Sequence, residues 1–346
     1  MDSDGAIEIK MYEPWMLEDL ARLRQGQYGE SIEANRSQIE RQFFHEFARD
    51  SSFIIVAQDG NTIVGMLTYT YWPYSYRGET YYSVQSGMLL VDKEYRRRGL
   101  FSRLALKADE VFKERQLDFV TGFPVPASLP GSIKAGALHI GTPKMIVRPL
   151  KPLKLISYKL SRSRGGTSEP DMVDNQPLSN RLAHEDLLSG EWRRVDSADA
   201  ICMKADRGFI DYRYGGKEGK YKIYRYGAGG QDLIFICKMN FLDGVNMLYI
   251  GDILVNGDSA YSLGKAIAWL IKDVRKEGNI DAIAIMLNTR RRGLFATFLR
   301  KGFLSYPSEG ARMIVLPVSV ESSQLELITD YSNWNAMWSD VDSWYI

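Results

Sequence analysis

The chain has 346 residues, more than one domain of about 100–150 residues holds, so we expect two domains. Hydrophobic residues make up 45% and charged residues 25%, values that are ordinary for a soluble globular protein. The 44 Lys and Arg against 43 Asp and Glu leave a net charge of +1, which argues against a protein that mainly coats nucleic acid or an acidic membrane. Any anion that this chain binds must therefore be held by local geometry.

The sequence gives no reason to expect a metal site or a disulfide framework. Two cysteines, Cys202 and Cys237, are too few for a disulfide framework or a cysteine-based cluster. The histidines His45, His139 and His184 show no metal-binding spacing, so no metal site is expected. The N-terminus lacks the features of a signal peptide, and no apolar run approaches the ~20 residues that span a bilayer. We therefore expect a cytoplasmic protein.

The first 150 residues follow the order strand, two helices, three strands, long helix, strand, short helix, strand. Apolar residues at 100, 104, 108 and 111 have the spacing of an amphipathic helix. Gln58-Asp59-Gly60-Asn61 is a turn sequence that joins two strands as a hairpin. The main expected elements are strands over 7–12, 53–57, 63–72, 81–91 and 117–123, and helices over 14–24, around 39–47 and over 100–112.

The order of elements then partly repeats after a polar segment rich in Gly, Ser and Pro. This segment predicts a linker over 151–180, between a first domain over 1–150 and a second over 181–320. The C-terminal tail 321–346 contains Trp334, Trp338 and Trp344, so we expect it to pack on a domain. In the second domain we expect strands over 221–226, 233–239, 247–255, 280–287 and 311–318, and helices over 263–274 and 294–300.

One hexapeptide, Arg-Arg-Arg-Gly-Leu-Phe, occurs at both 96–101 and 290–295. The first copy lies between a long strand and a long helix. The second lies one strand–helix unit later in its own domain, so the two copies are not expected to be equivalent.

The segment 88–104 carries the strongest functional pattern. A strand ends, a basic turn with one glycine follows, and a helix begins at once. A helix start leaves backbone N–H groups unpaired and has partial positive charge, so it suits a phosphate or pyrophosphate. Gly99 lets the backbone approach an anion closely, and Arg96–Arg98 add charge.

This segment resembles the acyl-CoA-binding motif of the GNAT N-acetyltransferase superfamily, Arg/Gln-x-x-Gly-x-Gly/Ala. Arg96, Gly99 and Phe101 occupy its marked positions, although Phe101 stands where a small residue is usual. The resemblance covers most of the first domain and implies two tandem α/β (α+β) GNAT-like domains, each a mixed, mostly antiparallel sheet flanked by helices. It also implies that N–H groups near Leu90 polarise a thioester carbonyl. The implied cofactor-binding residues are Leu89, Leu90, Val91, Arg96, Arg97, Arg98, Gly99, Leu100, Phe101 and Ser102.

No catalytic residue follows from the sequence. Many relatives use a Tyr at the position that Ser132 occupies here, so the general acid and base stay open. His139 and Glu79 lie close enough to the motif in sequence to be considered as residues of the active site, but a single His or Glu is more often a surface or packing residue. The aromatic run over 69–82 either walls an acceptor pocket or packs the sheet.

The resemblance implies a transferase that moves an acetyl group from acetyl-CoA, its co-substrate, to a primary amine of a small molecule or peptide. The near-neutral net charge leads us to expect no nucleic-acid or membrane partner, and the acceptor, acyl length and oligomeric state stay open. The second domain resembles a degenerate copy, because 256–261 lacks the motif and Asp258 would repel phosphate. Two alternatives remain: a Fem-type transferase that uses aminoacyl-tRNA, and a non-catalytic module that senses CoA.

Overall fold

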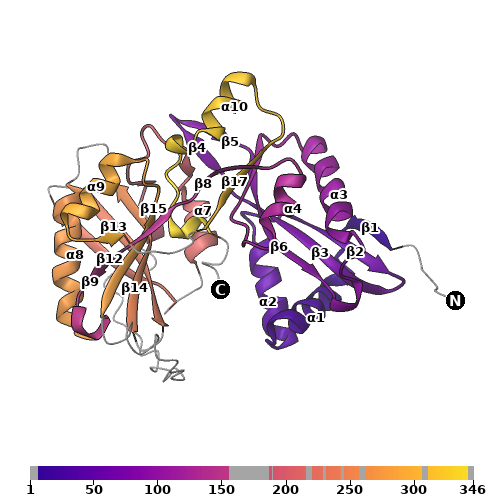
Figure 1. Ribbon diagram of the computed structural model, residues 1–346, viewed down its shortest axis with the longest axis horizontal. Helices are drawn as coiled ribbons and strands as arrows, with labels where there is room; N and C mark the ends of the chain where they lie inside the picture. Colours follow the sequence, from indigo (N-terminus) through magenta and orange to yellow (C-terminus); the bar gives the residue numbers. More distant parts are fainter. Residues whose placement is uncertain are drawn as a thin grey trace. The chain divides into compact units, whose positions relative to one another are not determined.

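The computed structural model describes residues 7–155, 187–188, 190–215, 220–228, 231–242, 245–256, 262–305 and 311–341 (Figure 1). The chain divides into two compact units. The first unit consists of residues 1–74, 79–141 and 312–329, and the second of 75–78, 142–311 and 330–346. Each unit is built on a mostly antiparallel sheet flanked by helices, which confirms the expected fold class.

The first unit has a seven-stranded sheet in the order β1-β2-β3-β6-β7-β17-β8. All neighbouring strands are antiparallel except β6 and β7, which are parallel. Its strands are β1 (Glu8–Met11), β2 (Phe53–Asp59), β3 (Thr62–Tyr71), β6 (Ser83–Val91), β7 (Phe119–Gly122), β8 (Leu138–Gly141) and β17 (Met313–Pro317). Two short strands outside this sheet, β4 (Tyr74–Tyr76) and β5 (Glu79–Tyr81), lie between β3 and β6 in the chain. Its helices are η1 (Pro14–Met16), α1 (Leu17–Tyr28), α2 (Ile32–Phe43), η2 (Lys93–Tyr95), α3 (Leu100–Glu114), α4 (Leu129–Lys134) and α10 (Ser322–Thr329).

Helices cover both faces of this sheet. Side chains alternate along a strand, so Ile55 and Ala57 of β2 pack in one cluster with α3. Ile54 and Val56 pack in another cluster with residues of α1 and α2. The strand β6 is therefore sandwiched, with α3 on one face and the α1–α2 pair on the other.

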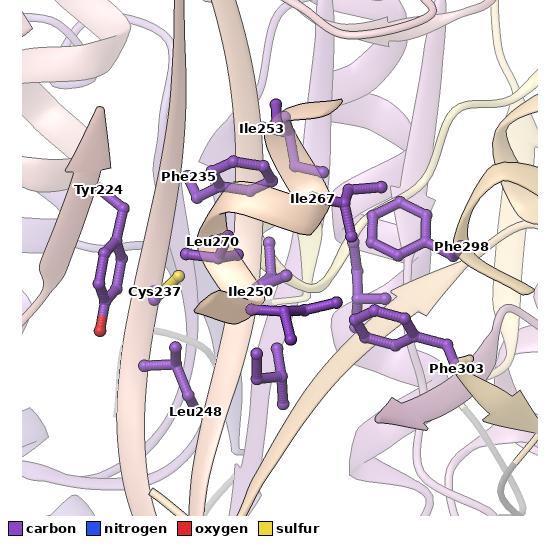
Figure 2. Packing of buried hydrophobic residues seen from close by; sticks show 14 of the residues in the cluster. Tyr224, Phe235, Cys237, Leu248, Ile250, Ile253, Ile267, Leu270, Phe298 and Phe303 are labelled. Carbon is purple, nitrogen blue, oxygen red and sulfur yellow. The ribbon is translucent and has the colours of Figure 1, made fainter. Parts of the chain in front are cut away.

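The second unit repeats this plan with the strand order β12-β13-β14-β15-β9-β16, and β10 pairs with β14 outside that path. Figure 2 shows its core, in which Ile267 of one helix and Phe298 of another point toward the sheet residues Phe235 and Ile250. Its strands are β9 (Lys144–Pro149), β10 (Trp192–Arg194), β11 (Cys202–Met203), β12 (Lys222–Ala228), β13 (Gln231–Leu242), β14 (Val245–Asn256), β15 (Ala282–Leu287) and β16 (Leu304–Ser305). Its helices are α7 (Arg207–Tyr214), α8 (Leu263–Glu277), α9 (Arg292–Arg300), η3 (Tyr331–Asn333) and η4 (Trp338–Asp340).

Two strands belong to units other than those expected from their place in the chain. The strand β9, expected to close the first domain, pairs with β15 in the second unit. Conversely, β17, expected to close the second domain, pairs with β7 and β8 in the first. The expected bounds 1–150 and 181–320 thus do not coincide with the observed units. Both strands are short apolar segments whose pattern fits either sheet, so the sequence does not specify their partners.

The tail after α10 packs into the second unit. Trp334 is buried, and Trp338 makes an edge-on contact with Tyr249 at 4.7 Å between ring centroids. Trp344 and residues 156–180 of the expected linker lie outside the described residues. A buried ion cluster holds the tail in place, because Arg194 of β10 bonds both Asp252 of β14 and Asp340 of η4.

Neither a membrane span nor a metal cluster occurs within the described ranges. None of the helices there is long and apolar enough to cross a membrane. No group of three or more metal-ligating side chains gathers in that part of the chain either.

Candidate acyl-CoA site

A β-bulge in β6 is the central feature of the site. Leu89 pairs with Leu67, whereas Ser86 pairs with Tyr69, so Gly87 and Met88 together oppose the single residue Thr68. The Thr68 hydroxyl accepts a hydrogen bond from the Met88 N–H at 2.8 Å. A Cβ on residue 87 would lie 2.8 Å from that hydroxyl, which explains the glycine.

Beyond the bulge, β6 presents backbone groups to an edge that no described strand covers. The parallel pairing with β7 ends where Ser86 meets Gly122. The Asp92 N–H donates to Val64 of β3, and alternate residues of a strand face opposite edges. Leu90 therefore faces β3, whereas Leu89 and Val91 face away from it.

This geometry refines the expected role of Leu90. Its N–H is directed to β3, so it does not serve a ligand at the open edge. The N–H groups of Leu89 and Val91 are available there, one on each side of Leu90. The Val91 carbonyl already accepts a bond from the Arg96 guanidinium at 3.1 Å.

The basic turn after β6 is held in shape by side chains. The Tyr95 hydroxyl donates to Asp59 at 2.8 Å, and the Arg98 guanidinium stacks on the Tyr95 ring at 4.8 Å. The backbone is left-handed at Arg97 (φ 67°) and at Gly99 (φ 73°). Because a left-handed non-glycine residue is unfavourable, Arg97 stores strain in this turn.

Immediately after this turn, α3 begins with its N–H groups exposed to a ligand. The first hydrogen bond of the helix runs from the Arg103 N–H to the Gly99 carbonyl, so the N–H groups of Leu100, Phe101 and Ser102 precede the helical ladder. No atom lies within 4 Å of a Cβ built on Gly99, and Arg96–Gly99 are exposed. The turn and helix start therefore offer N–H groups, positive charge and space for an anion.

The structure brings the predicted site residues together in one continuous segment, but it buries some of them. The side chains of Leu90 and Leu100 are buried in the core, so only their backbone groups could contact a ligand. Phe101 is half-buried, and its ring packs on α4. A Cβ on Gly131 would lie 2.7 Å from that ring, so the glycine accommodates the large residue at the third motif position.

No described side chain stands out as the general acid or base. Ser132 donates from its hydroxyl to the Ser128 carbonyl at 3.3 Å, within α4 itself. His139 is exposed and its ring lies 3.1 Å from the Gly141 carbonyl. The aromatic run packs the sheet: Tyr69 stacks on Phe53 at 5.0 Å, and burial raises the pKa of Tyr69.

The second unit has the same bulge, but its edge is filled. In β14, Ile250 pairs with Cys237 and Asp252 with Ile236, which leaves Gly251 as the extra residue. The parallel pairing with β15 also ends just before it, at Ile250. Gly251 thus corresponds to Gly87 of β6.

Beyond this second bulge, β10 runs antiparallel to β14. Since β13 holds one edge of β14, β10 lies on the other, the edge that stays open in β6. The Val195 N–H donates to the Ile253 carbonyl at 2.9 Å. The chain therefore fills, with its own strand, the place in the second unit where a ligand would pair. The expected loss of the phosphate turn over 257–261 lies outside the described residues.

Sequence reasoning missed two residues that shape this site. Thr68 anchors the bulge, and Arg24 of α1 contacts Met88 from the opposite face of the sheet. Thr68 fits the alternating pattern of any strand, and Arg24 lies in a helix with many charged residues. No sequence pattern therefore distinguishes either residue.

Comparison with known proteins finds a related domain and related folds. Residues 16–133 match the family model described as an acetyltransferase (GNAT) domain. No protein with a curated function matches the sequence. Among solved structures, a GCN5-related N-acetyltransferase from Kribbella flavida has a TM-score of 0.59 at 12% identity and covers 92% of this chain and 73% of its own.

Two further structures share the fold across both units. A GCN5-related N-acetyltransferase from Anabaena variabilis has a TM-score of 0.58 at 12% identity and covers 89% of this chain and 72% of its own. The N-myristoyltransferase of Saccharomyces cerevisiae, solved with bound myristoyl-CoA, has a TM-score of 0.52 at 13% identity and covers 91% of this chain and 79% of its own. Residues 16–133 are therefore similar to an acetyltransferase (GNAT) domain, and the chain shares its fold with solved N-acetyltransferase and N-myristoyltransferase structures.

Proposed function

We propose that this protein is an acyl-CoA-dependent N-acyltransferase with one acyl-CoA site, located in the first unit, and that acetyl-CoA is its donor. The observation that carries this proposal is the open edge of β6, which leads directly into the basic turn and the start of α3. An extended ligand with amides at one end and a pyrophosphate at the other fits this succession of groups.

Each part of the segment has its own task in the proposal. The N–H groups at the start of α3, with the side chains of Arg97 and Arg98, hold the pyrophosphate. The N–H of Val91 pairs with the pantetheine arm. The N–H of Leu89 donates to the thioester oxygen, where negative charge develops during attack.

In the proposed reaction, the nitrogen of a neutral primary amine attacks the thioester carbonyl carbon. The C–N bond forms, the C–S bond breaks, and the electron pair leaves with the CoA sulfur. The nitrogen loses one proton and the thiolate gains one, through water where no side chain serves. The acceptor is a small-molecule or peptide amine, and no nucleic acid or membrane takes part.

The second unit has a structural role in this proposal. Because β10 already pairs with the edge of β14 that corresponds to the open edge of β6, an acyl-CoA would have to displace it. The Arg194 ion cluster at this strand adds to the cost of that displacement. This role is in keeping with a degenerate second copy.

The test is thiol release from acetyl-CoA in the presence of amino acids, polyamines, aminosugars and peptides. Turnover by the wild type, lost in Gly99→Asp, is the expected result, because the new side chain strains the left-handed backbone of the turn and its carboxylate repels the pyrophosphate. Acetyl-CoA binding without turnover of any amine would favour a CoA sensor instead. Binding of tRNA without binding of acetyl-CoA would favour the aminoacyl-tRNA alternative. Long-chain acyl-CoA donors, tested in the same assay, define the acyl length.

A further inference from the structure

Arg24 is an unusual residue because it is a buried cation without a carboxylate partner. It lies on α1 and is only 3% exposed. Its Nε donates to Asn35 Oδ1 at 3.0 Å, and its two terminal nitrogens contact Gln38 Oε1 and the thioether sulfur of Met88. Burial lowers the pKa of Arg24, but an arginine stays protonated in a protein.

Each nitrogen of the guanidinium makes one hydrogen bond, and the group lies over the Tyr28 ring at 5.5 Å, but none of these partners carries a negative charge. An arginine has five N–H donors, and the described residues supply only three acceptors, one of which is a weakly accepting sulfur. No carboxylate within the described ranges forms an ion pair with it. Glu30 interacts with the cation electrostatically but does not bond it, and accepts a hydrogen bond from Gln38 at 2.8 Å instead. Buried charges are normally paired, so this guanidinium lacks a directly bonded anion.

Arg24 lies close to the place where the acceptor would react in the proposed function. Its contact Met88 belongs to the bulge of β6 and directly precedes Leu89, whose N–H faces the open edge. The side chain of Met88 packs with the α1–α2 cluster, on the face of the sheet opposite α3. An acceptor that approaches the thioester from the α1–α2 face would therefore pass Met88, a flexible and half-buried side chain.

We propose that Arg24 binds an anionic group of the acceptor, so that the substrate is an amine that also carries a carboxylate or a phosphate. The planar guanidinium matches both groups in a two-bond arrangement. Displacement of the Met88 thioether frees one N–H donor in addition to the two that bond no described acceptor. This inference rests on the proposed acyltransferase function and specifies its acceptor.

The experiment measures acetyl-CoA consumption with three matched pairs of amines that differ only in the anionic group. They are leucine and leucinamide, ethanolamine and phosphoethanolamine, and glucosamine and glucosamine 6-phosphate. The wild type is expected to use the anionic member of at least one pair with a kcat/KM at least about 10-fold higher, and the preferred pair identifies carboxylate or phosphate.

Variants then assign this preference to Arg24. Arg24→Gln is expected to raise the KM for the anionic amine about 10-fold or more and to leave the KM for acetyl-CoA unchanged. Arg24→Lys keeps the charge and is expected to retain part of the preference. The control is Arg22→Gln on the same helix, where an exposed arginine pairs with Glu18 and Asp19 and should not affect the preference.

Three outcomes would overturn the inference. Equal turnover of the neutral and the anionic member of every pair by the wild type would contradict it, and this result does not depend on the folding of any variant. A preference that survives in a folded Arg24→Gln would also contradict it. Acetyl-CoA binding without use of any anionic amine would count against it as well, whereas absence of acetyl-CoA binding would refute the proposed function itself.

Discussion

Replacement of Thr68 by valine tests whether the bulge of β6 positions the acyl-CoA site. Valine has nearly the shape of threonine but no hydroxyl, so the 2.8 Å bond from the Met88 N–H is lost. Removal of the acceptor leaves this backbone donor without its partner, at a cost of about 1–2 kcal/mol in the free energy of unfolding. For a unit of this size the melting temperature should fall by about 2–8 °C.

The effect on ligand binding follows from the alternation of β6. Without its anchor the bulge shifts or rearranges, and the N–H groups of Leu89 and Val91 lose their alignment at the open edge. The loss of one well-aligned hydrogen bond to the ligand corresponds to about 10-fold weaker acetyl-CoA binding, which isothermal calorimetry measures directly.

Thr70→Val is the matched control for this variant. Thr70 is also buried in β3, but its hydroxyl accepts a bond from the Gln42 side chain at 3.1 Å and not from a backbone N–H of the bulge. It should lose stability but keep its affinity for acetyl-CoA. Wild-type affinity in a destabilised Thr68→Val, or equal losses of affinity in both variants, would refute the positioning role of the bulge.

Three other substitutions test separate parts of the structure. Gly131→Ala brings a Cβ within 2.7 Å of the Phe101 ring and should weaken acetyl-CoA binding, and a second change, Phe101→Ala, should restore it. Arg194→Met leaves two buried carboxylates without their cation and should cost about 3–5 kcal/mol in urea denaturation. Burial raises the pKa of Asp281, but hydrogen bonds, led by that from Lys154, outweigh it and lower the pKa overall. The carboxylate therefore stabilises the fold fully above the unfolded pKa of about 4. Asp281→Asn should be less stable than the wild type at pH 7, and the difference should shrink below that pH and vanish as the pH falls through the lowered pKa of the folded protein.

Local patterns specify the elements of this protein well. The strand over 53–57 and the helix over 100–112 appear as β2 and α3 with small changes at their ends, because alternation and helical spacing are properties of short segments. The basic turn could also be predicted from the sequence, because a glycine and arginines between a strand and a helix are typical of an anion-binding turn.

Long-range features were not accessible in the same way. The exchange of β9 and β17 between the two sheets depends on pairing partners more than 100 residues away, which no local pattern encodes. The repeated hexapeptide shows the same limit. Gly99 precedes its helix with φ 73°, whereas Gly293 lies inside α9. One sequence thus forms two local structures, according to the strand and helix that flank it.

Calorimetric titration with acetyl-CoA tests the central claim most directly, because it counts the sites in the chain. The account predicts one molecule bound per chain, with binding lost in Gly99→Asp and unchanged in Gly293→Asp, the corresponding substitution in the second copy of the hexapeptide. Two molecules per chain, no binding to the wild type, or full binding in Gly99→Asp would contradict it.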